Sequence, residues 1–186
     1  MKVLHRLTLT IGALGTALAL IGALAVPTFA GGATRASATI VNTSGMAIGW
    51  ARFVEDATGL VHVSVHVKGL TPGLHGIHIH RAGDCTSPFT AAQSHYNPGG
   101  LSHGLDNSSG PHAGDLPNLT VNDDLIGHLD TTTDRVTLSD GPTTLFDSTV
   151  GQVGSSLVIH AGPDDQVTDP TGGSGGRVAC GVILAG

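Results

Sequence analysis

The sequence predicts an all-β protein, an eight-stranded Greek-key flattened barrel or sandwich with two long loops. Charged residues make up only 12% and aromatic residues 3% of the chain, while glycine occurs 28 times. This composition favours short strands and tight turns over long helices. Short apolar or alternating segments follow one another along the chain, and two long polar, Gly- and Asp-rich segments interrupt them. Many short strands joined by turns are typical of sandwiches and barrels.

The individual strands are predicted from their apolar patterns. In Leu60–Lys68, four valines point to one side, whereas His62, Ser64, His66 and Lys68 point to the other. This alternation indicates a half-buried strand, so His62 and His66 are expected at the surface rather than in a metal site. In chain order, the predicted strands are Ala38–Val41, Ala47–Glu55, Leu60–Lys68, Gly76–His80, Leu119–Val121, Leu125–Leu129, Arg135–Leu138, Ser156–His160 and Val178–Leu184.

Two segments between these strands are predicted to be long loops. Arg81–Leu116 and Ala161–Gly176 are rich in Gly and polar residues and show little apolar periodicity. Both are far longer than the usual connection of a few residues, and loops of that length are usually functional or disordered.

The N-terminus predicts a secretory signal peptide. Lys2 and Arg6 precede an apolar run from Leu7 to Val26, and small residues follow around Ala30. An uncleaved anchor is the alternative, since about 20 apolar residues can span a bilayer. We expect cleavage and a location that is secreted, periplasmic or in the cell envelope, with no membrane attachment afterwards. The expected division is 1–30 as leader, 31–44 as N-terminal segment and first strand, and 45–186 as the main domain.

Export has consequences for charge and for the cysteines. The chain carries 8 basic and 14 acidic residues, a net charge of −6, and loss of Lys2 and Arg6 leaves 6 and 14, or −8. Such a chain offers no basic surface for nucleic acid. The two cysteines, Cys85 and Cys180, are expected to pair in an oxidising compartment. The alternative is two unrelated buried thiols.

The histidines predict metal chemistry. His78 and His80 are two residues apart on a strand, so both imidazoles leave the same face and can hold one metal ion. The first long loop adds three nitrogens and one carboxylate, a set that satisfies a tetrahedral Zn²⁺ site. His160 ends a later strand and supplies a remote nitrogen, and imidazole ligation with an open position suits copper. The loop residues of this set are His95, His103, His112 and Asp115.

Five motifs make the assignment specific. They are Gly73–His80, His95–Pro98, Pro111–Leu116, Val158–His160 and Gly176–Ile183. In this order they resemble the copper strand, the bridging histidine, the last zinc ligands, the final copper ligand and the C-terminal signature of the copper–zinc superoxide dismutases. The resemblance extends over roughly Gly45–Gly186, and Ala161–Gly176 takes the place of the family's electrostatic loop.

The resemblance implies one copper and one zinc ion per subunit. Its implied copper ligands are His78, His80, His95 and His160. Its implied zinc ligands are His95, His103, His112 and Asp115. His95 would therefore bridge the two metals, and Asp164 would link a copper-ligand histidine to a zinc-ligand histidine. His75 matches a position that supports the metal strand rather than a ligand.

The implied activity is dismutation of superoxide to dioxygen and hydrogen peroxide. Arg177 would hold the superoxide anion beside the open copper position, and His95 would store a proton. Superoxide is the expected small-molecule partner, and a homodimer is one expected assembly. The sequence departs from the family pattern at Arg81, where an acidic residue is common, and in the second loop, which lacks lysine.

Three alternatives stand beside this interpretation. A noncatalytic exported protein could bind copper and zinc on the same scaffold, but such a protein would not need Arg177. A structural sandwich would leave the histidine cluster without a role. A copper-only relative would not need His103, His112 and Asp115 together.

Overall fold

The structure is a computed structural model, and it describes residues 34–146 and 154–186. The predicted leader, 1–30, lies outside the described residues. The strands are β1 Arg35–Asn42, β2 Ala47–Glu55, β3 Val61–Lys68, β4 Gly73–His75, β5 Ile77–His80, β6 Leu119–Val121, β7 Ile126–Thr133, β8 Ser156–His160, β9 Arg177–Val182 and β10 Leu184–Ala185. One short 3₁₀ helix, η1, spans Thr90–Ala92.

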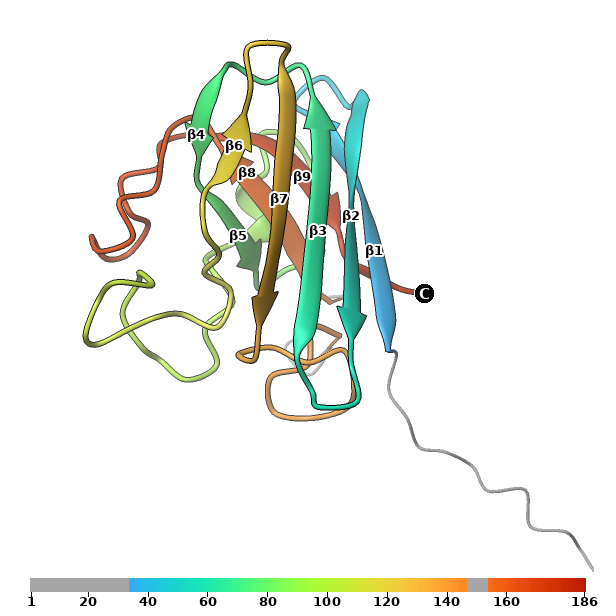
Figure 1. The fold of residues 1–186 in the computed structure, drawn as a ribbon, viewed down its shortest axis with the longest axis vertical. Coiled ribbons are helices and arrows are strands. Elements are labelled where there is room, and N and C mark those ends of the chain that lie inside the picture. The colour runs from blue at the N-terminus through green and yellow to red at the C-terminus, as the bar shows by residue number, and fades with distance from the viewer. Residues whose placement is uncertain (1–33, 147–153) are drawn as a thin grey trace, which may run out of the picture. The chain divides into compact units, whose positions relative to one another are not determined.

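The strands form one antiparallel sheet that curls into a nearly closed barrel (Figure 1). The order is β4-β6-β7-β3-β2-β1-β9-β8-β5, and β10 pairs with β1. The two edge strands, β4 and β5, are consecutive in the chain and are separated only by Gly76, so the chain itself joins the two edges of the sheet. β4 and β5 are one strand interrupted at Gly76, and β9 and β10 are one strand interrupted at Ile183. Counted in this way, the ten strands are eight, which confirms the predicted eight-stranded barrel.

The barrel interior is filled by aliphatic side chains. The four valines of β3 are 0–1% exposed, and Phe53 of β2 is fully buried. His62, by contrast, is exposed, and His66 stacks on Trp50 of the neighbouring strand with ring centroids 5.9 Å apart. The alternation of β3 therefore separates core from surface as predicted.

The predicted strand Arg135–Leu138 is wrong. β7 instead continues to Thr133, and the segment after it makes one isolated bridge, between Thr137 and Thr144. The carboxylate of Glu55, at the end of β2, accepts hydrogen bonds from the backbone N–H groups of Leu138 and Ser139, each at 2.7 Å. A distant side chain thus satisfies the N–H of Leu138, the last residue of the predicted strand, in place of a neighbouring strand.

The two predicted loops are present. They start at opposite ends of the antiparallel pair β5 and β8, because His80 lies opposite Ser156, and both lie at the left of the barrel in Figure 1. The first runs from Arg81 to β6 and contains η1, and the second runs from Ala161 to β9. Within the described ranges, no helix has the length and apolarity needed to cross a membrane.

Candidate metal centre

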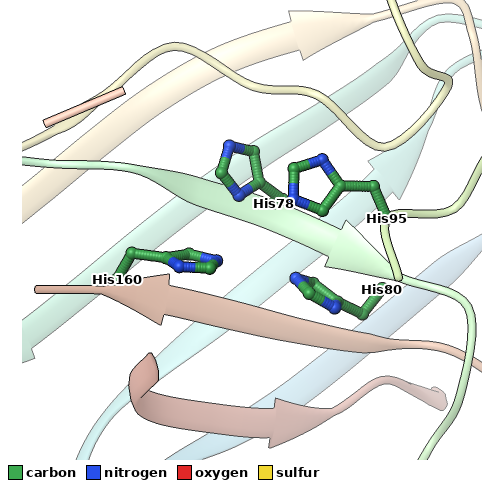
Figure 2. A group of neighbouring side chains, drawn as sticks. All are labelled: His78, His80, His95 and His160. Atoms are coloured by element: carbon green, nitrogen blue, oxygen red, sulfur yellow. The ribbon is translucent and has the colours of Figure 1, made fainter. Parts of the chain in front are cut away.

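Two paired strands and the first loop bring four imidazoles together. His78 and His80 lie on β5, His160 ends β8, and the two strands are antiparallel neighbours. His95 reaches them from the loop through an isolated bridge with His80. Figure 2 shows the four rings turned toward a common space between the strands and the loop. One nitrogen from each lies within 4.8 Å of the others.

The free nitrogens of these rings fit a copper ion. Nδ1 of His78 and Nε2 of His80, His95 and His160 are buried and have no hydrogen-bond partner among the described residues. A buried polar atom without a partner is costly, and four such atoms facing one another are the arrangement that a metal ion satisfies. An all-nitrogen set suits copper.

Hydrogen bonds on the opposite ring atoms orient these ligands. His80 Nδ1 donates to the carbonyl of Gln93 at 2.7 Å, and His160 Nδ1 donates to that of Gly175 at 3.0 Å. Each bond places the proton on Nδ1 and leaves the Nε2 lone pair toward the site. His75 acts behind them, with Nδ1 2.6 Å from the His160 carbonyl oxygen and Nε2 2.9 Å from that of Thr71.

A second cluster, around Asp115, has the donor set of a zinc site. Oδ1 of Asp115 lies 3.0 Å from Nδ1 of His95, 3.0 Å from Nδ1 of His103 and 3.4 Å from Nδ1 of His112. Three imidazole nitrogens and one carboxylate oxygen converge, as a closed tetrahedral zinc site requires. The other oxygen, Oδ2, accepts the backbone N–H groups of Gly104 and His112, each at 2.9 Å, which fixes the carboxylate plane.

His78 also lies within 4.8 Å of His95, His103 and Asp115, but its nitrogens point elsewhere. Its Nε2 donates to Asp164 at 2.7 Å. Its Nδ1 is one of the four unpartnered nitrogens of the copper group, which consists of His78, His80, His95 and His160. His112 fits the zinc set better, because its Nδ1 is 3.3 Å from Nδ1 of His95. His95 thus presents Nδ1 to one cluster and Nε2 to the other, the geometry of a bridging imidazole.

Asp164 connects the two clusters from behind. Its Oδ2 accepts the His78 hydrogen bond at 2.7 Å, and its Oδ1 accepts one from His103 Nε2 at 3.0 Å. Both side-chain pairs are fully buried. The predicted linking geometry of this carboxylate is therefore present.

Electrostatics favours neutral rings at His78, His80 and His160 and a charged ring at His103. Burial lowers the pKa of His78 to about 3 and that of His160 to about 4, so both rings are neutral near pH 7. Burial would also lower the pKa of His103, but hydrogen bonds to Asp115 and Asp164 outweigh it and raise that pKa to about 9. Zinc would therefore have to displace a proton from His103.

Arg177 lies at the opening of the copper group. A cavity of about 450 Å³ is lined by His80, His95, His160, Thr171 and Arg177, among others. The guanidinium donates from Nη1 to the carbonyl of Phe89 and from Nη2 to that of Gln93. These bonds hold the cation in place at the cavity wall. Arg81, by contrast, is exposed and is not among the residues that line this cavity.

The disulfide between Cys85 and Cys180 is confirmed. Their Cα atoms are 5.6 Å apart, within the normal range for a disulfide. The bond fastens the first loop to β9, the strand that begins with Arg177. It therefore anchors the part of the loop whose carbonyls hold that arginine.

Sequence reasoning missed two residues that contact the metal-site segments. Asn118 pairs with the backbone of Asp164, and Arg135 Nη2 donates to the Asp115 carbonyl at 2.7 Å. In the sequence, Asn118 stands in an Asn-Leu-Thr triplet, which is a pattern for N-glycosylation and does not indicate a contact with a metal site. No local pattern pairs residues 46 or 20 positions apart.

Comparison with known proteins matches these residues to one family. Residues 47–183 match the copper/zinc superoxide dismutase (SODC) family. The chain is 42% identical over 151 residues to superoxide dismutase [Cu-Zn] 2 of Aquifex aeolicus (strain VF5), covering 80% of this chain and 86% of that protein. It is 39% identical over 148 residues to superoxide dismutase [Cu-Zn] 1 of the same organism, covering 78% and 85%.

Solved structures agree with the fold. A SOD-like protein from Bacillus subtilis superposes with a TM-score of 0.74 at 33% identity, covering 80% of this chain and 97% of that one. The clock protein EA4 superposes with a TM-score of 0.70 at 33% identity, covering 82% and 95%.

Proposed function

Because the chain belongs to the copper/zinc superoxide dismutase family, we propose that it dismutates superoxide. The net reaction consumes two superoxide anions and two protons and yields one dioxygen and one hydrogen peroxide. The observation that carries this proposal is the set of four unpartnered imidazole nitrogens, because three of these four histidines line one cavity together with an anchored arginine. A bound copper ion would supply the one-electron redox chemistry.

The proposed copper ligands are His78, His80, His95 and His160. The proposed zinc ligands are His95, His103, His112 and Asp115. In this arrangement a zinc ion held by these four residues would order the first loop, because a loop without an apolar pattern gains stability from metal binding.

Arg177 is the proposed substrate-binding residue. Two backbone carbonyls hold its guanidinium, so this cation has a fixed orientation in the cavity wall. A small anion placed there would meet a planar cation with donors in fixed geometry. His95 is the proposed proton carrier, because its Nε2 faces the cavity group without a protein partner and can hold a proton for the developing peroxide.

The test is superoxide decay, measured by pulse radiolysis on protein whose copper and zinc contents have been determined. We expect catalytic decay for the wild type and a loss of about tenfold or more for Arg177→Met, with unchanged metal contents. Arg177→Lys serves as the matched variant that keeps the charge but loses the planar donors.

A noncatalytic protein that binds both metals is the rival function. It predicts full copper and zinc occupancy with decay no faster than that of chelated copper. That result would replace the dismutase proposal. Equal rates of superoxide decay for wild type and Arg177→Met would show that the arginine takes no part in the mechanism.

We further propose that residues 1–30 direct export and are then removed, leaving a protein that is secreted or retained in the cell envelope. The charged-then-apolar order of the segment and the disulfide, which persists in oxidising compartments, support this proposal. N-terminal sequencing of protein recovered outside the cytoplasm tests it. A first residue of Met1 would contradict cleavage.

A further inference from the structure

Asn118 makes a reciprocal pair of hydrogen bonds with one peptide of the second loop. Its Oδ1 accepts the backbone N–H of Asp164 at 2.8 Å, and its Nδ2 donates to the backbone carbonyl of Asp164, also at 2.8 Å. One side-chain amide therefore satisfies both main-chain groups of a single residue. Such two-point contact fixes the position and the rotation of the Asp164 backbone, as a strand ladder would.

The residue held in this way carries the carboxylate between the two metal clusters. Asp164 is only 4% exposed, and its two oxygens receive hydrogen bonds from His78 and His103. Gly172 packs against the same carboxylate so closely that an added Cβ would lie 1.7 Å from Oδ1. The carboxylate thus has little room, and its direction depends on where the backbone of Asp164 is held.

The position of Asn118 in the chain makes it a link between the loops. It follows Asp115 by three residues and directly precedes β6, whose first residue, Leu119, is fully buried. The end of the first loop is therefore tied to the barrel core on one side and to Asp164 on the other. The Nδ2 atom that a glycan would occupy in this Asn-Leu-Thr triplet is already donating to Asp164.

We propose that Asn118 is a positioning residue that acts through Asp164 to hold the imidazoles of His78 and His103 in their metal-binding orientation. This inference rests on the metal sites of the proposed function. Loss of partners behind metal ligands typically lowers metal affinity by about 10–100-fold. Because Asn118 contacts Asp164 and not a histidine, we expect its removal to lower metal affinity by an amount at the lower end of that range.

The experiment measures zinc affinity in metal-free protein by competition with a chromophoric chelator, and then the visible absorption of added Cu²⁺. For Asn118→Ala we expect about tenfold weaker zinc binding and a shifted Cu²⁺ absorption band. Asn107→Ala is the matched control. Its Nδ2 also joins the two loops, because it donates to the carbonyls of Val167 at 3.0 Å and of His103 at 2.9 Å, but it contacts neither oxygen of Asp164. This control should keep the Cu²⁺ band of the wild type.

A double-mutant cycle separates positioning from general stabilisation. If Asn118 acts through Asp164, then Asn118→Ala should change zinc affinity little in an Asp164→Ala background. Equal effects of Asn118→Ala in both backgrounds, or an unchanged zinc affinity and Cu²⁺ band, would overturn the inference. Should Asn118→Ala not fold, Asn118→Asp takes its place, since it keeps the acceptor for the Asp164 N–H and loses the donor.

These outcomes are independent of catalysis. Wild-type protein that binds both metals and shows the predicted coupling, yet does not accelerate superoxide decay, would refute the proposed function alone. Active wild-type protein without the coupling would refute the role of Asn118 alone.

Discussion

At the scale of single residues, each histidine of the centre is defined by which of its nitrogens is free. His80 and His160 donate from Nδ1 to backbone carbonyls, whereas His78 donates from Nε2 to Asp164. The proton positions that follow leave one lone pair per ring for the metal. The same residue type therefore contributes different atoms, depending on which neighbour accepts its N–H.

The two clusters should be separable by mutation. His103→Ala removes a ring shared between Asp115 and Asp164, so we expect loss of zinc and of loop order first, and of copper second. His160→Ala removes a nitrogen from the copper group alone and should abolish superoxide decay while zinc is kept. Metal analysis and limited proteolysis of the loop distinguish the two. The same pattern of metal loss in both variants would contradict this division.

At the scale of elements, the barrel is joined where β4 and β5 meet. The N–H of Gly76 donates to the carbonyl of Gly162 at 2.8 Å, and its carbonyl accepts the N–H of His160 at 2.8 Å. A Cβ at this position would lie 2.6 Å from Cβ of Ser174 and 3.2 Å from Cβ of Asp164. The strand break therefore brings the second loop against the metal strand.

Replacing Gly76 by alanine should separate these elements. We expect Gly76→Ala to lower the free energy of unfolding by about 1–3 kcal/mol, because overpacking forces the second loop away from the strand. Denaturant unfolding of the metal-free protein measures it. Gly99→Ala is the control, because its Cβ would meet only Cγ of Leu101 at 3.8 Å. Equal stability of Gly76→Ala and wild type would contradict the contact.

The segment after β7 is held by Glu55, and this contact should be pH-dependent. Partial burial acts to raise the pKa of Glu55, but hydrogen bonds from Ser139 and Leu138 outweigh it and hold the pKa below its usual value of 4.5. A lowered pKa means that the stabilisation is present above about pH 4.5 and is lost as the pH falls through the folded-state pKa.

Glu55→Gln should therefore be less stable than wild type at pH 7, by about 1 kcal/mol, since hydrogen bonds to a charged group are partly replaced. The difference in unfolding free energy between the two proteins should disappear as the pH falls through the folded-state pKa of Glu55. Unfolding of both metal-free proteins at a series of pH values measures the gap. A difference that stays constant down to pH 3 would show that the ionised carboxylate is not what holds Ser139.

At the scale of the whole molecule, charge opposes the substrate. The chain without residues 1–30 carries six basic and fourteen acidic side chains, and superoxide is an anion. The second loop contributes the uncharged Pro170 and Thr171 to the cavity, while its Asp164 is buried and its Asp169 accepts the backbone N–H of His103 at 2.6 Å. Among the residues that line the cavity, Arg177 carries the only permanent positive charge.

We therefore expect weak electrostatic steering. Positive clefts can raise association rates by about 10–1,000-fold, and that gain falls with ionic strength. The catalytic rate of this protein should change less than about threefold between 0.02 and 0.2 M salt. Arg81→Glu should leave the rate within about twofold of wild type, because Arg81 lies outside the cavity lining. A steep fall with salt, or a large effect of Arg81→Glu, would contradict this account.

The sequence by itself determined most of the strand pattern, the candidate ligand residues and the family. Alternation such as that of β3 is local, so it identifies a strand and its buried face without knowledge of the neighbours. The candidate metal ligands are recognisable because imidazole and carboxylate at those spacings have few other uses together. The cysteine pair followed from the expected oxidising compartment and the absence of other cysteines.

Only the tertiary structure decided which ring nitrogens face each candidate metal site and which residues hold those rings. The bonds from Asn118 to Asp164, from Arg177 to the carbonyls of Phe89 and Gln93, and from Glu55 to Ser139 join positions 46 to 88 residues apart. The predicted strand at Arg135–Leu138 failed for the same reason, because the backbone N–H of Leu138 donates to the carboxylate of Glu55, 83 residues away, and not to a neighbouring strand. Such contacts depend on which distant segments the barrel brings together, and local periodicity does not predict those pairs of segments.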